Sequence, residues 1–547
     1  MKNTTMFKKI FVIISIITLF AFVPAMAASP YYHDTGIEYD DSNDHIKIVD
    51  NVVYELCDRG EYERSPEYSV IEFGATKEIR KKMTEIVIRE EIDGIPVREI
   101  CGEPDKDCVN PMAIYPNVSK ITIPDSIVRI GRMSFSGLIN IKKIDLPAGL
   151  KELGSKAFGR LEKLEEVSIP ESIERIKAET FKGCIALKKV TFKGNVRRID
   201  ESAFDGCKSL SNINSGNKLE YIGYRAFYNC ANLKSFYFSK TLKTIEAWAF
   251  NGSGLTSVSI PSGAKLSKYW STEDSNCIYG PQVKNGKSLK KVAFGNTKNA
   301  VTIPLDCFAG CTALKSVALP ESAKKISIYP GAFRQSGLTK VKLPSGTVFV
   351  KSSFTNEAEK SCYGSQFKDC KKLNSIVFED TKKSVVIPND CFAGCTALKS
   401  VALPKSAKGI TLFPRAFYNC TSLKTVENSG RISGIRASAF KNCKSLESIK
   451  FSSKIKYIEK MAFKGCSKLK SVTFKDTKSV PVNTYAKNSI RTSFDKGIFA
   501  GTPNNMNFFV KNAAVAKKLR TALKGSGVRN ARIYTISGNR LVYTGVK

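Results

Sequence analysis

The sequence predicts a repeat solenoid, a right-handed coil with a parallel β-sheet along one face, turns or short helices on the other, and a cap at each end. Three observations predict it. Phenylalanines recur every 23 residues, at Phe135, Phe158, Phe181, Phe204, Phe227 and Phe250 and again at Phe417, Phe440 and Phe463. Each unit contains an alternating V-x-F stretch that is typical of a short strand. A proline often follows this stretch, where it ends strand pairing because it has no N–H donor.

The N-terminus predicts a secretion signal over residues 1–27. Three lysines precede an apolar run from Ile10 to Val23, and Ala-Met-Ala at residues 25–27 supplies a cleavage site. The run is too short to span a bilayer comfortably, and no later segment is long and apolar enough to do so. We therefore expect a mature chain that starts near Ala28 and contains no transmembrane segment. We expect it to be secreted, with association with the cell surface as an alternative.

Residues 28–83 predict an acidic segment followed by a cap. Between residues 29 and 110 there are 10 Lys and Arg against 21 Asp and Glu, whereas residues 111–547 contain 73 against 29. Two β-prone runs, NVVYELC and YSVIEFG, flank a polar turn, as expected for a cap on the first coil. The basic body that follows would attract anionic polymers, although a solvated lysine surface that keeps a solenoid soluble explains the charge equally well.

The repeats themselves are expected over residues 84–474. One unit reads L-x-x-V-x-F-x-x-x-V-x-x-I-x-x-x-A-F-x-x-C, as between Leu187 and Cys207. Less regular units are anchored at Met112, Val283, Phe308, Phe333, Phe367, Phe392 and Phe499, which brings the number of units to 16. A single unit cannot bury its apolar positions, but stacked copies place each apolar column on itself and make one continuous core.

Two insertions, near residues 262–282 and 345–366, interrupt this register. They occupy equivalent places, because a block of three units recurs with an offset of 84 residues. Insertions in a solenoid form loops that commonly lie on the binding face. Their aromatic residues are candidate ligand-binding anchors, namely Tyr269, Trp270, Phe349 and Phe354. The alternative is that these rings fold back over the coil as a satellite core.

Residues 475–547 predict a last irregular unit and a C-terminal cap. NAAVAKKLRTALKG reads as a helix with Val515, Leu519 and Leu523 on one face and Gly525 at its end, and ARIYTI reads as a strand. A basic amphipathic helix could also lie on a membrane. A cap is favoured, because the last coil of a solenoid must be shielded.

Nine of the 16 cysteines lie three residues after the anchor position and form one column. They are Cys184, Cys207, Cys230, Cys311, Cys370, Cys395, Cys420, Cys443 and Cys466. Packing as small apolar residues is the favoured interpretation. A zinc site would lack its usual partners, because the only histidines are His33 and His45. Disulfides are harder to dismiss, but an in-register column points its side chains the same way, so we expect buried free thiols here and consider Cys101 with Cys108 the best candidate bridge.

A second column carries charge. Directly after the repeat leucine, eight units have a lysine: Lys142, Lys188, Lys234, Lys290, Lys315, Lys399, Lys424 and Lys470. Like charges in register cost stability, so this column is a candidate site for an anionic partner. Ordinary solvated surface is the equal alternative.

The recurring pattern LKKVTFKGNVRRIDESAFDGCKS, together with EIDGIPVREI at residues 91–100, resembles the BspA-like leucine-rich-repeat surface proteins over residues 84–474. The resemblance implies a bacterial leucine-rich-repeat solenoid, displayed or secreted, that mediates adhesion or binds protein or glycan. The alternative is a structural protein held by its basic repeats to an anionic cell-wall polymer. We expect a monomer with no specific nucleic-acid partner.

No motif supports catalysis or a cofactor. Asp34-Thr-Gly resembles an aspartic-protease triplet but lacks a second copy, and the acidic run at residues 40–45 lacks the glycine and distal glutamate of a calcium loop. The repeats contain no histidine. We therefore expect neither an enzyme nor a metal site.

Overall fold

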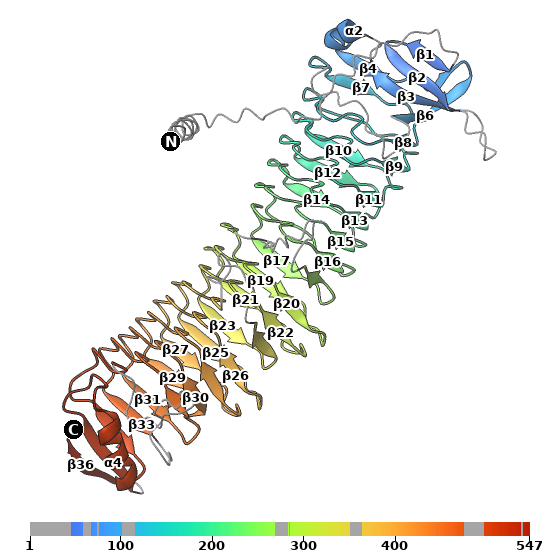
Figure 1. Cartoon of the computed structure of the whole chain (residues 1–547). Helices are drawn as coiled ribbons and strands as arrows, with labels where there is room; N and C mark the ends of the chain where they lie inside the picture. The colour runs from blue at the N-terminus through green and yellow to red at the C-terminus, as the bar shows by residue number, and fades with distance from the viewer. Residues whose placement is uncertain are drawn as a thin grey trace, which may run out of the picture.

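The computed structural model describes residues 45–57, 67–73, 76–100, 115–267, 283, 285–350, 364–474, 497–537 and 540–546. These residues form an elongated stack of coils with a cap at each end, coloured blue at the N-terminal end and red at the C-terminal end in Figure 1. The predicted repeat solenoid is confirmed.

The V-x-F stretches form the first ladder of parallel strands. Neighbouring coils pair in register, so that Val167 lies beside Val190 and Val190 beside Ile213. The valine points into the core and its neighbours point outward, as the alternation requires. The strands of this ladder are β4 (Glu85–Val87), β7 (Lys120–Thr122), β10 (Glu166–Ile169), β12 (Lys189–Phe192), β14 (Asn212–Asn214), β17 (Ser257–Ile260), β19 (Lys291–Phe294), β21 (Ser316–Ala318), β23 (Lys340–Leu343), β25 (Ser375–Phe378), β27 (Ser400–Ala402), β29 (Thr425–Glu427), β31 (Ser448–Phe451), β33 (Ser471–Phe474) and β34 (Asn507–Val510).

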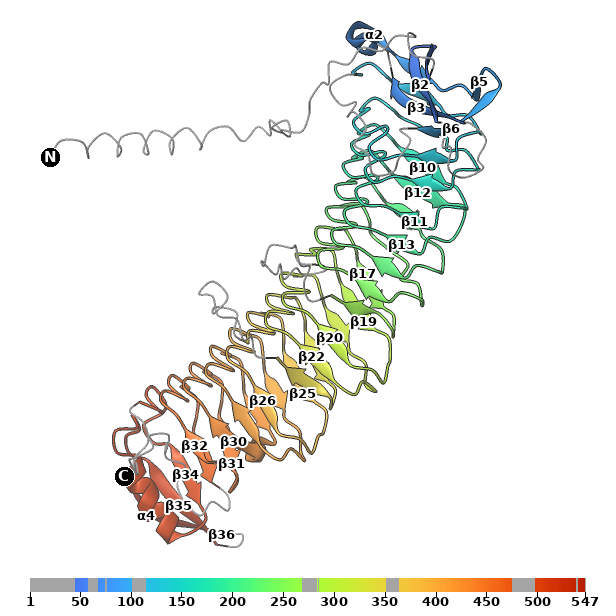
Figure 2. The same ribbon diagram turned by 45° about the vertical axis from the view of Figure 1, so that its right-hand side comes forward.

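A second parallel ladder, which the sequence did not predict, runs beside the first (Figure 2). It uses the V-x-x-I part of each unit, and Ile176 pairs with Ile199 and Ile199 with Ile222. Its strands are β8 (Arg129–Ile130), β9 (Glu152–Leu153), β11 (Arg175–Ile176), β13 (Arg198–Ile199), β15 (Tyr221–Ile222), β16 (Thr244–Ile245), β18 (Lys265–Leu266), β20 (Val301–Ile303), β22 (Ile326–Ile328), β24 (Thr347–Phe349), β26 (Val385–Ile387), β28 (Ile410–Leu412), β30 (Ile432–Ile435) and β32 (Tyr457–Ile458). The 3-10 helix η3 (Ser429–Arg431) precedes β30.

The third side of each coil is a turn that carries the anchor phenylalanine. Its backbone is also bonded between coils, since the amide of Phe204 donates to the carbonyl of Ala226 at 2.8 Å. In the same turn Ser202 and Gly206 have φ angles of 53° and 78°, and glycine adopts the second without strain. Helix in the described part of the chain is limited to η3 and the two caps, so turns rather than helices make this side.

The anchor rings stack through the core. Consecutive rings are nearly parallel, with centroids from 5.1 Å apart at Phe333 and Phe367 to 5.8 Å at Phe135 and Phe158. The buried Val283 takes the place of a ring between Phe250 and Phe308. This stack is the continuous core that the 23-residue period predicts.

The N-terminal cap extends both the sheet and the ring stack. β1 (Ile46–Val49), β2 (Val52–Cys57) and β3 (Glu67–Phe73) are antiparallel, and β3 then pairs in parallel with β6 (Ile95–Ile100), which forms a hairpin with β5 (Glu91–Ile92). The short helix α2 (Lys77–Lys82) begins after Thr76. Phe73 stacks on Phe135 with ring centroids 5.7 Å apart. The sequence-predicted anchor for this place, Met112, lies outside the described residues.

The C-terminal cap is a helix and a hairpin. Helix α4 (Ala513–Ala522) begins at Asn512, whose side chain accepts a hydrogen bond from the amide of Val515 at 3.0 Å. Val515, Leu519 and Leu523 are buried, as their spacing predicts. β35 (Arg532–Ser537) continues the first ladder beside β34, and β36 (Arg540–Val546) pairs with it antiparallel.

Candidate functional site

The eight lysines of the predicted column lie in one row along the outside of the coils, and all eight are exposed. Each follows a buried leucine, or Ile141 in the case of Lys142, so the repeat itself positions it. Only two pairs are direct neighbours. The amide of Lys315 donates to the carbonyl of Lys290, and that of Lys424 donates to Lys399, each at 2.9 Å. Elsewhere polar or acidic residues separate the lysines, so repulsion within the row is smaller than the sequence suggested.

One member of the row is neutralised by a neighbouring coil. Glu165 occupies the column position between Lys142 and Lys188, and its carboxylate accepts from Lys188 Nζ at 2.7 Å. This hydrogen bond, with the charge of the same lysine, lowers the pKa of Glu165. Within the described residues the lysines from Lys234 to Lys470 form no ion pair, so the available charge of the column lies toward the C-terminal end.

The aromatic candidates in the insertions divide into two groups. Tyr269, Trp270 and Phe354 lie outside the described residues. Phe349 is the last residue of β24, where it pairs with Ile328 and is buried. Its ring meets Phe367, Phe378 and Phe392 edge-on, with centroids 6.2 to 6.4 Å away. The hypothesis that Phe349 is a surface ligand anchor is therefore wrong, because its ring completes the core.

The insertions also begin later than expected. Residues 265–266 form β18 and residues 347–349 form β24, and both strands belong to the second ladder. The sequence analysis missed Gln366, which occupies the small-residue position before the anchor Phe367 and is fully buried. Its side-chain amide donates to the carbonyl of Val350 at 3.1 Å and so ties the two ends of the second insertion together.

The nine column cysteines are buried free thiols. Each Sγ donates to the carbonyl of the anchor residue in the preceding coil at 3.0 to 3.2 Å, as Cys207 does to Phe181 and Cys370 to Phe333. The sequence analysis missed this bond. Ser253, Ser336 and Thr502, which replace cysteine in this column, gave no signal for it. The hydroxyl of Thr502 donates within its own coil to Phe499, that of Ser336 lies against Cys370 Sγ, and that of Ser253 has no hydrogen-bond partner among the described residues.

Burial raises the pKa of seven of these thiols, whereas at Cys370 hydrogen bonds outweigh burial and lower the pKa. The pKa of Cys184 and of Cys311 rises to about 12, because an apolar environment penalises the thiolate. A protonated thiol is a poor metal ligand and a poor nucleophile. Across the described ranges, no group of three or more His, Cys, Asp or Glu side chains is placed to hold a metal ion. The expected Cys101 to Cys108 bridge lies outside those ranges.

A groove of the described surface lies where the N-terminal cap meets the first coils. It has a volume of about 970 Å³, and its charged lining residues are Glu67, Arg98, Arg129, Lys151, Glu152, Glu174, Arg175 and Lys177. Most of these charges are already paired. Arg129 contacts Glu67 and the buried Glu99, and Lys177 bonds Glu152 at 2.5 Å. Little charge is left there for a ligand.

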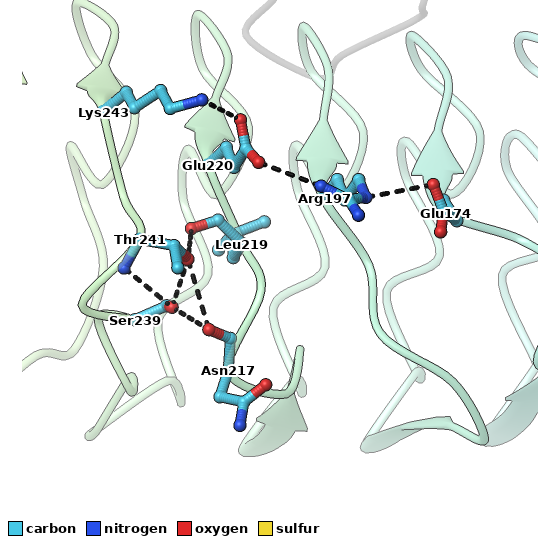
Figure 3. A network of polar contacts seen from close by, with 8 residues as sticks. All are labelled: Glu174, Arg197, Asn217, Leu219, Glu220, Ser239, Thr241 and Lys243. Carbon is cyan, nitrogen blue, oxygen red and sulfur yellow. Dashed lines mark hydrogen bonds and ion pairs between the residues drawn. The ribbon is translucent and has the colours of Figure 1, made fainter.

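An ion-pair ladder runs along the turns that join the two strands of each coil in the N-terminal half (Figure 3). Arg197 bonds Glu174 in the preceding coil and Glu220 in the next, both at 3.1 Å, and Lys243 bonds Glu220 at 2.5 Å. The acids and bases of neighbouring coils therefore satisfy one another along this edge. No helix in the described part of the chain is long and apolar enough to cross a membrane.

A family model matches the repeats of this chain. The family model of the BspA type leucine rich repeat region matches residues 114–177, 156–277, 283–361 and 360–491. A search of curated protein sequences gives no match. Similar solved structures include a leucine-rich repeat protein from Bacteroides ovatus, at 20% identity and a TM-score of 0.49 over 90% of this chain and 100% of that chain. They also include a leucine rich cell surface protein from Faecalibacterium prausnitzii, at 17% identity and a TM-score of 0.30 over 90% of this chain and 95% of that chain. A third is the pneumococcal vaccine antigen PcpA, at 15% identity and a TM-score of 0.32 over 90% of this chain and 98% of that chain.

Proposed function

Because this chain belongs to the BspA-type leucine-rich repeat family, we propose that it is a non-catalytic binding protein that works outside the cell, either secreted or displayed at the surface. The observation that carries the proposal is that each unit separates buried from exposed positions. The anchor, thiol and strand columns are buried in the core, while the outer positions present cations in rows. Such a surface offers contacts to an extended partner rather than a reaction centre.

Adhesion to an extracellular protein or an anionic glycan is the specific activity we propose. The aromatic residues Tyr269, Trp270 and Phe354 and the lysine column remain the candidate contacts, with Phe349 withdrawn. Aromatic rings supply binding energy where they are exposed, and the column supplies long-range attraction.

A binding screen of mature protein (residues 28–547) over matrix proteins and glycans tests this proposal. We expect capture of at least one partner at physiological salt. The double variant Trp270→Ala with Phe354→Ala should weaken capture and leave the melting temperature unchanged if these rings bind. A lowered melting temperature with full binding would instead place them in a satellite core and remove them as contacts. Failure to capture any partner would contradict the function itself.

The excess of Lys and Arg over the repeats favours one alternative, a structural role in which charge holds the protein to an anionic cell-wall polymer. Salt separates the two functions, because exposed charges more than a Debye length apart are screened. Release from cells by moderate salt together with an empty binding screen would support the structural role. Retention in salt with a captured partner would contradict it.

A further inference from the structure

The turns between the two strands change character halfway along the solenoid. In the N-terminal half they carry the ion-pair ladder of Glu174, Arg197, Glu220 and Lys243 (Figure 3). In the C-terminal half the same turns carry ten cations, which we call the basic edge: Lys298, Lys324, Lys325, Lys382, Lys383, Lys405, Lys408, Arg431, Lys454 and Lys456.

Within the described structure, none of the three acids of these C-terminal turns forms an ion pair with a cation of the basic edge. Glu321 and Glu379 both bond Lys342 on β23, at 2.6 and 2.8 Å. Asp380 accepts from the amide and the hydroxyl of Ser406, at 2.7 and 2.6 Å. Within the described residues the ten cations form no ion pair with a carboxylate, whereas the equivalent turns of the N-terminal half are cross-linked. Lys454 Nζ donates to the carbonyls of Ala407 and Lys408 at 3.3 and 3.1 Å, but no carboxylate in the described part of the chain neutralises it. The charge of the basic edge is therefore available to a ligand.

The basic edge is a row and not a scattered patch, because its turns are joined through the backbone, although the turn at residues 344–346 carries no cation. The amide of Lys324 donates to the carbonyl of Lys298 at 3.2 Å, and that of Val301 donates to Lys325 at 2.8 Å. Six steps between coils at about 4.8 Å each give the row a length of roughly 29 Å. A small anion would meet only one or two of these charges, whereas a polymer laid along the solenoid axis would meet all of them.

The side chains on and between the cationic turns favour one class of anionic polymer over others. The turns also present hydroxyl and amide groups at Asn296, Ser322, Ser384 and Ser453, which can bond sugar hydroxyls. Nine of the ten cations are lysines, whereas arginine is the usual choice for bidentate phosphate contacts. Residues 295–300, 319–325, 379–384 and 403–409 contain no aromatic ring, and stacking on such rings is how single-stranded nucleic acids are usually held.

We infer that the basic edge binds a linear anionic polysaccharide, whose sulfate or carboxylate groups follow the coils between Lys298 and Lys456. This inference rests on the proposed binding function and names the class of partner and its location. It assigns the site to the turn lysines, which are distinct from the lysine column at the start of the first strands. The N-terminal half would contribute less. In its equivalent turns Arg197 and Lys243 pair with carboxylates, and only Lys151, Lys193, Lys218 and Lys240 form no ion pair within the described residues.

The test measures binding of full-length mature protein to heparin fragments of defined length. The edge variant combines Lys324→Gln, Lys325→Gln, Lys382→Gln and Lys383→Gln. Exposed charge contacts are worth a few tenths of a kcal/mol each, so we expect affinity to fall by about tenfold. Affinity of the parent protein should rise with fragment length until the chain spans the roughly 29 Å of the edge.

A control variant removes the same number of charges. It combines Lys371→Gln, Lys372→Gln, Lys444→Gln and Lys468→Gln, which are exposed lysines of the C-terminal coils between the anchor and the repeat leucine. The control should retain affinity within about twofold, and both variants should melt like the parent because the residues are exposed.

An equal loss in the edge variant and in the control would overturn the inference, since binding would then depend on total charge alone. Polyphosphate of matched length separates polysaccharide from phosphate polymer. Equal or tighter binding of polyphosphate through the edge would overturn the assignment to polysaccharide. Capture of a protein partner without any heparin binding would overturn the inference while leaving the proposed function intact.

Discussion

Single residues show how neighbouring positions on one strand can have opposite roles. In β24 Phe349 is 8% exposed and its ring meets three other phenylalanines, whereas Val348 beside it is 45% exposed. The alternation of a strand accounts for the difference, because consecutive side chains point to opposite faces. The thiol column lies on turns and not on strands, and there the side chain points into the core and donates to a carbonyl of the preceding coil.

Phe349→Ala should lower the free energy of unfolding by about 3 to 5 kcal/mol, since it removes a buried ring and leaves a cavity. Val348→Ala is the matched control and should stay within about 0.5 kcal/mol. Urea unfolding followed by circular dichroism measures both. Similar small effects for the two variants would contradict the placement of Phe349 in the core.

The buried thiols predict a loss of stability at alkaline pH. In the folded protein the pKa of Cys184 and of Cys311 is about 12, whereas an exposed thiol has a pKa near 9. Above pH 9 the unfolded chain therefore releases protons that the folded chain retains. The stabilisation is complete below pH 9 and is lost as pH rises toward 12.

Urea midpoints at pH 8, 9 and 10, measured with reductant present, check this expectation. The midpoint should fall across the series, and the fall should be shallower in the double variant Cys184→Ser with Cys311→Ser, which retains two hydroxyl donors. The same slope in variant and parent would show that other groups, such as lysines, cause the decline.

At the scale of the element, each turn edge is a charge pattern set by neighbouring coils. Arg197 reaches Glu174 and Glu220 because the three residues occupy the same position in consecutive coils. These side chains remain largely exposed, so the ladder orders the edge more than it stabilises it. Where the acids are replaced or engaged elsewhere, the edge becomes a cationic surface.

Arg197→Gln should lower the melting temperature slightly in low salt and leave it unchanged in 1 M salt, where the Debye length is about 3 Å. Lys193→Gln removes the same charge from the same turn but breaks no ion pair within the described residues, so it is the control. Differential scanning calorimetry at the two salt concentrations measures both variants. A large effect of Arg197→Gln that persists in salt would indicate packing rather than an ion pair.

At the scale of the whole molecule, the solenoid is a linear stack of coils, and the exposed core at each end must be covered by a different cap. The N-terminal cap supplies strands and the ring of Phe73, and the C-terminal cap supplies a helix and a hairpin. Between them every coil contacts only its neighbours, so stability is spread along the stack and the ends are where it would begin to open.

A chain that ends before residue 513 should lose the shield over the last coil. We expect a lower melting temperature and concentration-dependent association, because buried residues such as Phe499 and Phe508 would then face water. Light scattering after size exclusion and a thermal melt measure this. Lys517→Gln with Lys518→Gln, which changes only the exposed face of α4, should behave like the parent. A monomeric truncated chain with the melting temperature of the parent would contradict the role of the cap.

The sequence alone determined the repeat, the core columns and the burial of the thiols. It could do so because a residue in a solenoid lies beside the residue one period away, so that Phe181 stacks on Phe204 as the 23-residue spacing requires. The helix of the C-terminal cap was also predictable, since its apolar face is encoded locally in Val515, Leu519 and Leu523.

Only the tertiary structure decided the second ladder, the role of Phe349 and the pairing of the lysines. These features depend on hydrogen bonds and charges that another coil supplies. The second ladder exists through backbone bonds between coils, and Phe349 becomes core because β22 draws it into that ladder. The ring of Phe73 joins the anchor stack from a segment with no repeat pattern. The candidate site follows the same rule, since whether a lysine is neutralised, as Lys188 is by Glu165, depends on which residue the neighbouring coil places beside it.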